Sequence, residues 1–302
     1  MDNFITILKT VFLGIVEGIT EWLPISSTGH MILVDELLHM NMRKEFMDIF
    51  FVIIQLGAIF AVIILFWSKI WPFHTKKTAV KPYFEGEKIG SIRRVCNSYI
   101  YMDKIIIWIK ILIASLPAAV IGLLFDDQID SMLTGDMRAF VVASTLIIYG
   151  VLFIVIESLK KRESVLTTDD ISYKMAFLIG LIQCLAIVPG TSRSGTTILG
   201  AVLLGATRTV AAEFSFFLSI PAMLGASAIK LLMFFAEGNF ITPYEITILL
   251  IGCIVAFAVS VLAIKFLLSF IKKHDFKAFG YYRIVLGAIV LAYFLCDNNG
   301  IG

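Results

Sequence analysis

Six apolar runs, each near the length of a membrane-spanning helix, constrain the fold more than any other feature of this sequence. They cover residues 46–71, 104–125, 138–158, 208–236, 244–270 and 280–296. A helix of about 20 residues crosses the ~30 Å hydrocarbon layer of a bilayer. Because backbone polar groups find no water in that layer, each run must satisfy them internally, as an α-helix does. The sequence therefore predicts an all-α, polytopic membrane protein.

The composition agrees with a single membrane domain over residues 1–302. Hydrophobic residues make up 59% of the chain and charged residues only 16%, which is more apolar surface than a soluble core could bury. The formal net charge is +2, so no bulk electrostatic attraction to nucleic acid is expected. The bilayer is the expected surrounding.

Four further apolar segments are shorter than the six runs. They form two pairs, 4–20 with 27–38 and 173–188 with 194–206, and a proline and a polar loop interrupt each pair. Non-helical backbone at membrane depth is tolerated where it lines an enclosed cavity. We therefore expect about ten helices, namely six full spans and two pairs of re-entrant half-helices.

The distribution of charge predicts which loops face the cytoplasm, because Lys and Arg concentrate in cytoplasmic loops. The basic loop 72–103 and the basic stretches 160–174 and 272–277 are expected inside. The acidic loop 126–136 and both termini are then expected outside.

The two halves of the chain resemble each other weakly. An offset of 165 residues places Pro24 on Pro189, and nearly the same offset places Phe50 on Phe216. Each half, about 1–158 and about 172–296, holds an odd number of spans, so the second copy must enter the membrane upside down. This is an inverted-topology repeat, which brings the two polar loops together near the midplane.

The first polar loop begins with two carboxylates. Glu17 and Glu21 are four residues apart, so they share one face of a helix. Two such charges in a low-dielectric site must share a proton, a cation or a strong donor, and an oxygen-binding divalent ion, Mg²⁺ or Ca²⁺, suits them. The alternative is an ordinary pair that reaches toward the membrane interface from a helix end.

Hydroxyls and an imidazole follow these carboxylates. Either Ser26 or Ser27 is expected to cap the next helix. His30 lies three residues after Ser27, so a contact between the two could activate the hydroxyl as a nucleophile. The alternative for His30 is a hydrogen-bonded packing residue.

The second polar loop has the composition of an anion site. Gly190 and Gly195 bracket a run of hydroxyls and Arg193 immediately before a new helix. Helix N-termini attract anions, and a guanidinium adds a planar fork for phosphate oxygens. In a soluble protein the same residues would be a turn. Gln55 and Gln183 are expected to do no more than hydrogen-bond between the repeats.

Together the two motifs, E-G-I-T-E-W-L-P-I-S-S-T-G-H from Glu17 and P-G-T-S-R-S-G-T-T from Pro189, resemble the undecaprenyl-pyrophosphate phosphatase family, also known for bacitracin resistance. The resemblance covers nearly the whole chain. It implies a bacterial plasma-membrane enzyme that hydrolyses a polyprenyl diphosphate lipid to its monophosphate with a divalent cation, at a site facing the periplasm or outer surface. This reaction recycles the lipid carrier for cell-wall synthesis.

The resemblance also implies roles for individual residues. Glu17 and Glu21 handle the metal or a proton, Ser27 and His30 form the catalytic pair, and Arg193 binds the diphosphate. Contacts to substrate are expected from the neighbouring small and hydroxyl residues Ser26, Thr28, Gly29, Ser192, Ser194, Gly195 and Thr196.

Two questions stay open at this point. The same inverted repeat could build a transporter or flippase of a polyprenyl phosphate, but a transporter needs no nucleophile, so Ser27 and His30 favour the enzyme. The attacking group could be Ser27, His30 or a water. A homodimer is possible.

Overall fold

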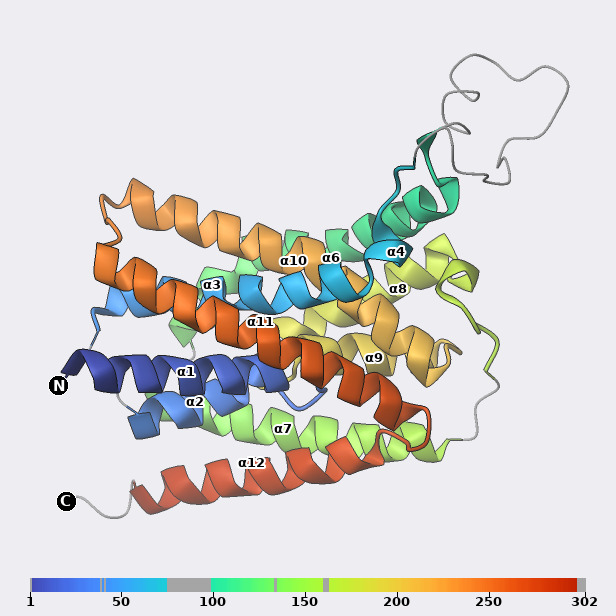
Figure 1. Ribbon diagram of the computed structural model, residues 1–302. Helices are drawn as coiled ribbons and strands as arrows, with labels where there is room; N and C mark the ends of the chain where they lie inside the picture. Colours follow the sequence, from blue (N-terminus) through green and yellow to red (C-terminus); the bar gives the residue numbers. More distant parts are fainter. Residues whose placement is uncertain are drawn as a thin grey trace, which may run out of the picture.

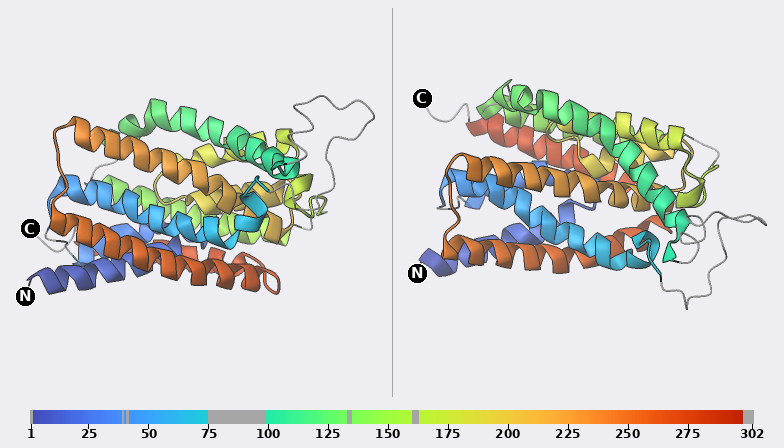
Figure 2. Two further views of the ribbon diagram at one scale, coloured as in Figure 1. Left: turned by 45° about the horizontal axis from the view of Figure 1, so that its top comes forward. Right: turned by 90° about the horizontal axis from the view of Figure 1, so that it is seen from above.

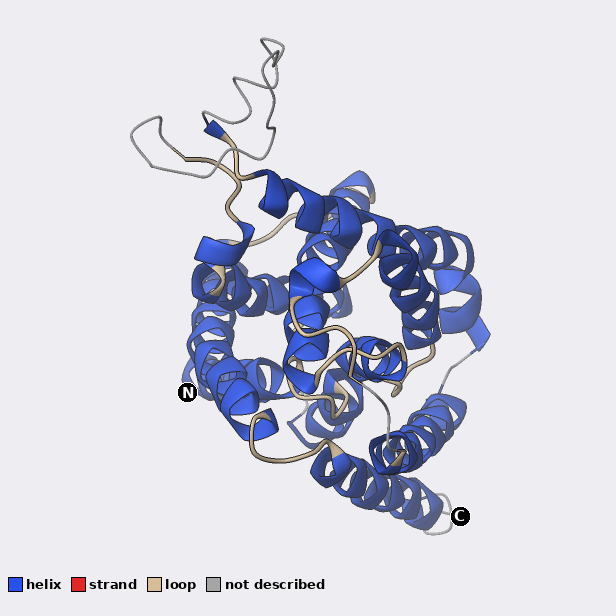
Figure 3. Ribbon diagram, turned by 90° about the vertical axis from the view of Figure 1, so that its right-hand side faces the viewer, coloured by secondary structure: helices blue, strands red, loops and turns tan. Residues whose placement is uncertain are grey.

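The computed structural model describes residues 2–38, 40, 42–74, 99–132, 135–159 and 163–297. Within these ranges the regular structure is helical and contains no β-strand (Figure 3). The α-helices are α1 (Asp2–Thr20), α2 (Ser27–Leu38), α3 (Lys44–Leu65), α4 (Trp67–Ile70), α6 (Met102–Met132), α7 (Gly135–Ser158), α8 (Tyr173–Gln183), α9 (Arg193–Leu203), α10 (Arg208–Ala236), α11 (Pro243–Ile271) and α12 (Lys277–Asp297). The predicted all-α class is confirmed.

In the described part of the chain, 7 helices are long and apolar enough to cross a membrane: α1, α3, α6, α7, α10, α11 and α12. Six of them coincide in position with the predicted spans. The seventh, α1, was expected to be too short, and that prediction was wrong. Its apolar stretch, Asn3–Thr20, reaches 18 residues because the helix continues through Glu17.

Two predicted boundaries also need correction. The run 46–71 is not one helix, because α3 ends at Leu65 and the single turn α4 follows after Phe66. The helix α6 continues past residue 125 to Met132 and carries Pro117 in its interior. The basic residues 75–94 that anchored the charge argument lie outside the described residues.

The long helices run side by side along one common direction (Figures 1 and 2). The pair α1 and α2 enters the bundle from the end where α12 finishes, and the pair α8 and α9 enters from the opposite end (Figure 1). With 12 and 11 residues, α2 and α9 are only about 16–18 Å long at ~1.5 Å per residue. The polar loops at the two tips therefore meet inside the bundle.

Helices from the two halves of the chain pack crosswise. The late helix α11 packs against α1 and α3, the early helix α6 packs against α8 and α10, and α7 packs against α12. Glycines permit the closest approaches. A Cβ at Gly57 would lie 2.2 Å from the carbonyl oxygen of Cys253, and one at Gly180 would lie 2.3 Å from that of Ala114. These close contacts fix the position of α3 along α11 and that of α8 along α6.

A buried aromatic cluster anchors the tip of the first pair. Trp22 is fully buried and meets Phe216 of α10 edge to face, with ring centroids 5.4 Å apart. Phe66 packs on Phe217 in the same way, at 5.3 Å. Edge-to-face pairs add to the stabilisation that comes from burying the rings. The loop after α1 is therefore held against α10, beside α9.

Candidate functional site

Glu21 lies at the centre of the polar region. One carboxylate oxygen, Oε2, accepts a hydrogen bond from Ser27 Oγ at 2.7 Å, and the other, Oε1, accepts one from Arg193 at 2.7 Å. Ser194 Oγ also donates to the main-chain oxygen of Glu21, at 3.1 Å. Glu21 is buried, so these charge-assisted bonds form away from bulk water. The two motifs meet as predicted, and Glu21 joins them.

The second helix of each pair, α2 and α9, begins after the same backbone conformation. Ser26 and Ser192 precede α2 and α9, and both adopt positive φ, +73° and +69°. The Ser26 Oγ accepts the N–H of Gly29 at 3.2 Å, and the Ser192 Oγ accepts the N–H of Gly195 at 3.1 Å. The predicted cap is therefore Ser26, which leaves the Ser27 hydroxyl free for Glu21. A serine at positive φ is strained by about 1–3 kcal/mol, which is typical of functional sites.

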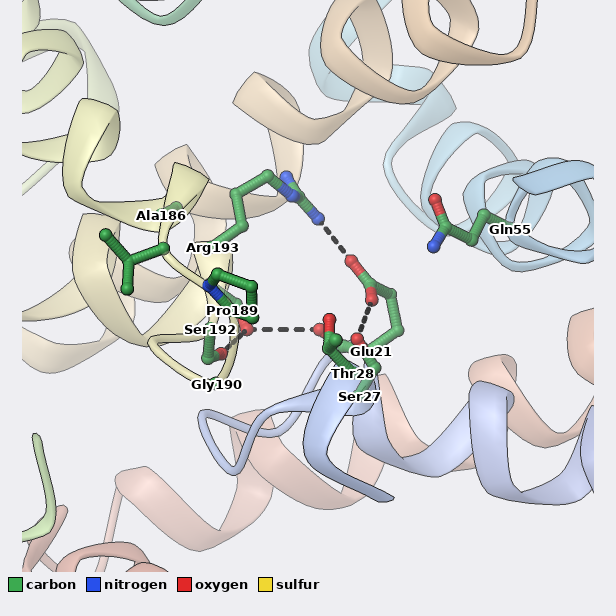
Figure 4. A pocket seen from close by; sticks show the side chains of 11 residues that line it. Glu21, Ser27, Thr28, Gln55, Ala186, Pro189, Gly190, Ser192 and Arg193 are labelled. Atoms are coloured by element: carbon green, nitrogen blue, oxygen red, sulfur yellow. Dashed lines mark hydrogen bonds and ion pairs between the residues drawn. The ribbon is translucent and has the colours of Figure 1, made fainter. Parts of the chain in front are cut away.

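A cavity of about 200 Å³ lies between the two tips (Figure 4). Predicted site residues that line it are Glu21, Ser27, Thr28, Ser192, Arg193 and Ser194. Gln55 of α3 also lines the cavity, on the side opposite Ala186 (Figure 4). The cavity can hold a polar headgroup but is far too small for a polyprenyl chain.

Arg193 has one free arm. Its NH2 nitrogen bonds Glu21, whereas its buried NH1 nitrogen has no partner among the described residues. A buried unpaired donor is costly, so a bound anion would relieve it. The arrangement fits the predicted role of Arg193 in binding phosphate oxygens.

The predicted contact between Ser27 and His30 is not made. His30 Nδ1 donates to the main-chain oxygen of Ser26 at 2.7 Å, and Nε2 lies 2.7 Å from the hydroxyl of Tyr282. Since Nδ1 carries the proton of a neutral ring, Nε2 accepts from that hydroxyl. Ser27 turns to Glu21 instead, because the cap at Ser26 places it at the start of α2, facing the end of α1.

Other predicted residues support the loops and do not line the cavity. Thr196 Oγ1 donates to the main-chain oxygen of Ser192 at 2.7 Å. Gly29 and Gly195 supply the N–H groups bound by the two caps. Glu17 is fully buried one turn before Glu21, and its Oε1 has no partner among the described residues.

Comparison with known proteins decides the family. A family model described as "Bacitracin resistance protein BacA" matches residues 10–289. The chain belongs to this family. An "Undecaprenyl-diphosphatase" of Enterococcus faecalis is 54% identical over 291 residues, which cover 96% of this chain and 97% of that protein. One of Acetivibrio thermocellus is 53% identical over 291 residues, 96% of this chain and 98% of that protein. The resemblance drawn from the two motifs is confirmed.

Sequence reasoning missed the support that α12 gives to the site of this BacA family member. Arg283, which is fully buried, donates to the main-chain oxygens of Pro24, Gly190 and Thr191. Its neighbour Tyr282 contacts His30. A signal was present, because Arg283 is the sole charged residue in the apolar run 280–296, and an ionisable residue in a span marks function by default.

Gln55 was noted in the sequence but ranked too low. Its place on the cavity wall comes from α3, which packs against α10 and α11 and contacts α1. An amide can bond either phosphate oxygens or water there. No spacing in the sequence connects it to either motif.

The carboxylates offer a limited metal site. In the described ranges no group of three or more His, Cys, Asp or Glu side chains could hold an ion. Glu17 and Glu21 remain, with the hydroxyl of Ser27 bonded to Glu21, and Oε1 of Glu17 has no hydrogen-bond partner in the described part of the chain. Such a hard oxygen set fits Mg²⁺ or Ca²⁺ when substrate oxygens and water complete the coordination.

Proposed function

We propose that this chain hydrolyses undecaprenyl diphosphate, or a closely related polyprenyl diphosphate, to the monophosphate and inorganic phosphate. The observation that carries the proposal is the simultaneous bonding of Glu21 to Ser27 and Arg193 beside a headgroup-sized cavity. Membership of the BacA family and close relatives named undecaprenyl-diphosphatase support it. Such an activity recycles the lipid carrier of cell-wall synthesis and underlies bacitracin resistance.

In this mechanism Ser27 is the nucleophile and Glu21 its base. The Ser27 hydroxyl gives its proton to Oε2 of Glu21 as Oγ attacks the terminal phosphorus, and the anhydride P–O bond breaks to release the lipid monophosphate. The proton passes from Glu21 to the departing phosphate. Glu21 then takes a proton from water as the water oxygen attacks the phosphoserine. The bond between phosphorus and Ser27 Oγ breaks, and Glu21 returns the proton to Oγ, which restores the hydroxyl as inorganic phosphate leaves.

Arg193 would hold the phosphoryl group during both steps. Its free NH1 arm and the N–H groups at the start of α9 present donors to negative charge, which grows as the reaction proceeds. The ion pair with Glu21 keeps the guanidinium in place before substrate arrives.

His30 takes a positioning role in this scheme. Both of its ring nitrogens are engaged, one by a main-chain oxygen and one by Tyr282. A ring held in this way orients the turn at Ser26. An attack by His30 itself would require the ring to give up its contact with Tyr282.

A divalent cation would be held by Glu17 and Glu21. When bound, it would neutralise charge on the diphosphate. The chain's own contribution is the buried pair of carboxylates, one of which has an oxygen without a partner among the described residues. The donors of this set are carboxylate oxygens, without the Cys sulfur or His nitrogen of structural zinc sites.

The membrane arrangement proposed is an inverted repeat, about 1–158 and about 172–296, with a site that opens to the periplasm or outer surface. Entry of the two short pairs from opposite ends supports it (Figure 1). The matching caps at Ser26 and Ser192 and the crosswise packing of α6 and α11 support it too. Association into a homodimer stays a prediction.

The decisive experiment traps the covalent step. Purified protein is mixed with a prenyl diphosphate labelled in the terminal phosphate, and the reaction is quenched in acid. We expect acid-stable label on Ser27 and none in Ser27→Ala, with Ser158→Ala, an exposed serine of α7, as the matched control. Acid-labile label on His30 would reject the mechanism. Unlabelled protein with substantial turnover in Ser27→Ala would point to direct attack by water, and failure of wild type to release phosphate would reject the activity.

A further inference from the structure

Arg283 of α12 is a buried cation with an unusual set of partners. Its side chain is 0% exposed, and no carboxylate among the described residues bonds it. Its guanidinium donates instead to the main-chain oxygens of Pro24 at 3.2 Å and of Gly190 and Thr191 at 2.9 Å each. The guanidinium carbon also lies 5.3 Å from the centre of the Tyr149 ring. Burying a charge without a counterion is expensive, so its placement calls for a reason.

The three carbonyl groups belong to the two loops that carry the site. Pro24 lies between Glu21 and Ser27 in the first loop, and Gly190 and Thr191 precede Arg193 in the second. One planar guanidinium therefore spans both loops. Its fork geometry fixes the distance and the angle between them.

The contact with Thr191 also determines where a neighbouring donor points. In a trans peptide the C=O and N–H groups point in opposite directions. Because the Thr191 oxygen faces Arg283, the N–H of Ser192 faces away from it, and Ser192 lines the cavity. Arg283 thereby sets the direction of a main-chain donor at the N-terminal end of α9, where anions bind.

Tyr282 adds a second support from the same turn of α12. Its hydroxyl bonds Nε2 of His30, and the two rings stack with planes 3° apart. His30 in turn bonds the main-chain oxygen of Ser26, next to Ser27. Two successive residues of α12 thus hold the first loop at Pro24 and the first turn of α2 at His30.

We propose that Arg283 is a positioning residue for the phosphoryl transfer: it clamps the carbonyl groups of both loops and keeps Ser27, Glu21 and the Ser192 N–H in register. Arg283 does not line the cavity. The proposal rests on the site proposed above and extends it to α12. Arg283, the lone charged residue of the apolar run 280–296, thereby has a role in catalytic geometry and not in membrane anchoring.

The test uses full-length purified protein and measures kcat, KM and thermal stability for Arg283→Ala and Arg283→Lys. Misplacing reacting groups by about 1 Å can lower a rate by ~10²-fold, so we expect kcat to fall by that order in Arg283→Ala with a smaller change in KM. An ammonium can bond some of the carbonyl oxygens but not span the loops as a fork does, so Arg283→Lys should be intermediate. Added methylguanidinium should restore part of the kcat of Arg283→Ala.

Arg43→Ala is the matched control. Arg43 also bonds a loop carbonyl, that of Phe240, and a carboxylate, Glu245, but it lies at the end of the bundle and away from the cavity. We expect Arg43→Ala to lower thermal stability, to keep wild-type kcat and to show no response to methylguanidinium.

Three results would overturn the proposal. They are a wild-type kcat in folded Arg283→Ala, a loss of kcat that methylguanidinium does not restore in either Arg283 variant, and failure of both variants to fold, which would make Arg283 a folding residue. Arg193→Lys in the same assay separates this inference from the proposed site. Full activity of Arg193→Lys rejects the site itself, whereas an inactive Arg193→Lys beside an active Arg283→Ala rejects only the clamp.

Discussion

Glu21→Gln is the most informative single substitution, because it changes almost no volume and removes two functions at once. One carboxylate oxygen accepts a hydrogen bond from the hydroxyl of Ser27 and the other accepts one from the guanidinium of Arg193, each at 2.7 Å. A glutamine offers one acceptor and one donor group in the same place. Whichever way the amide turns, it either faces Arg193 with a donor or stops accepting from Ser27.

The expected magnitude follows from these two losses. A positioned general base contributes about 10²–10⁴-fold to a rate. A hydrogen bond to a charged group contributes about 1.5–3 kcal/mol, part of which Glu21 uses to hold Arg193 before substrate binds. We therefore expect kcat to fall at least ~10³-fold, which corresponds to about 4 kcal/mol of transition-state stabilisation.

The assay measures release of inorganic phosphate from undecaprenyl diphosphate in detergent, with kcat and KM determined separately. Glu213→Gln is the control, because Glu213 of α10 also forms an ion pair, with Lys69 of α4, and does not line the cavity. We expect that control to keep wild-type kcat. If Glu21→Gln keeps kcat within tenfold of wild type while remaining folded, Glu21 is not the base for Ser27 and the proposed mechanism fails.

Other substitutions test the remaining parts of the site and the orientation in the membrane. Arg193→Lys keeps the charge but cannot offer a planar fork, so activity in phosphate release should fall by ~10²-fold or more, and near wild-type turnover would show that Arg193 does not bind the phosphoryl group. Glu17→Gln halves the carboxylate charge available to a cation and should raise the Mg²⁺ or Ca²⁺ concentration that gives half-maximal activity; an unchanged titration would remove Glu17 from the ligands. Single cysteines in a cysteine-free chain should react with an impermeant reagent in intact cells at Asn239, in the turn between α10 and α11, and not at Lys273, and the reverse pattern would invert the proposed topology.

The order of the helices and the identity of both loops could be predicted from the sequence. Apolar runs of spanning length leave a chain no choice other than helices in a bilayer, so the six predicted spans, with residues 46–71 shortened at α3, are present. Ionisable and hydroxyl residues are rare and costly at that depth, so Glu17, Glu21, Ser27 and Arg193 stood out without any coordinates. Their meeting across 172 residues of sequence was predicted from the weak resemblance between the two halves, and the bond between Arg193 and Glu21 confirms the meeting.

Side-chain pairing was decided only by the tertiary structure. Spacing along one helix made His30 the natural partner of Ser27, but the positive φ of Ser26 turns that hydroxyl to Glu21 of another helix. The support from α12 has the same origin, because Arg283 binds main-chain oxygens, and carbonyl groups leave no trace in a sequence. Hydropathy acts residue by residue and is therefore readable from the chain, whereas hydrogen-bond partners depend on backbone angles and on helix packing across the bundle, which exist only after folding.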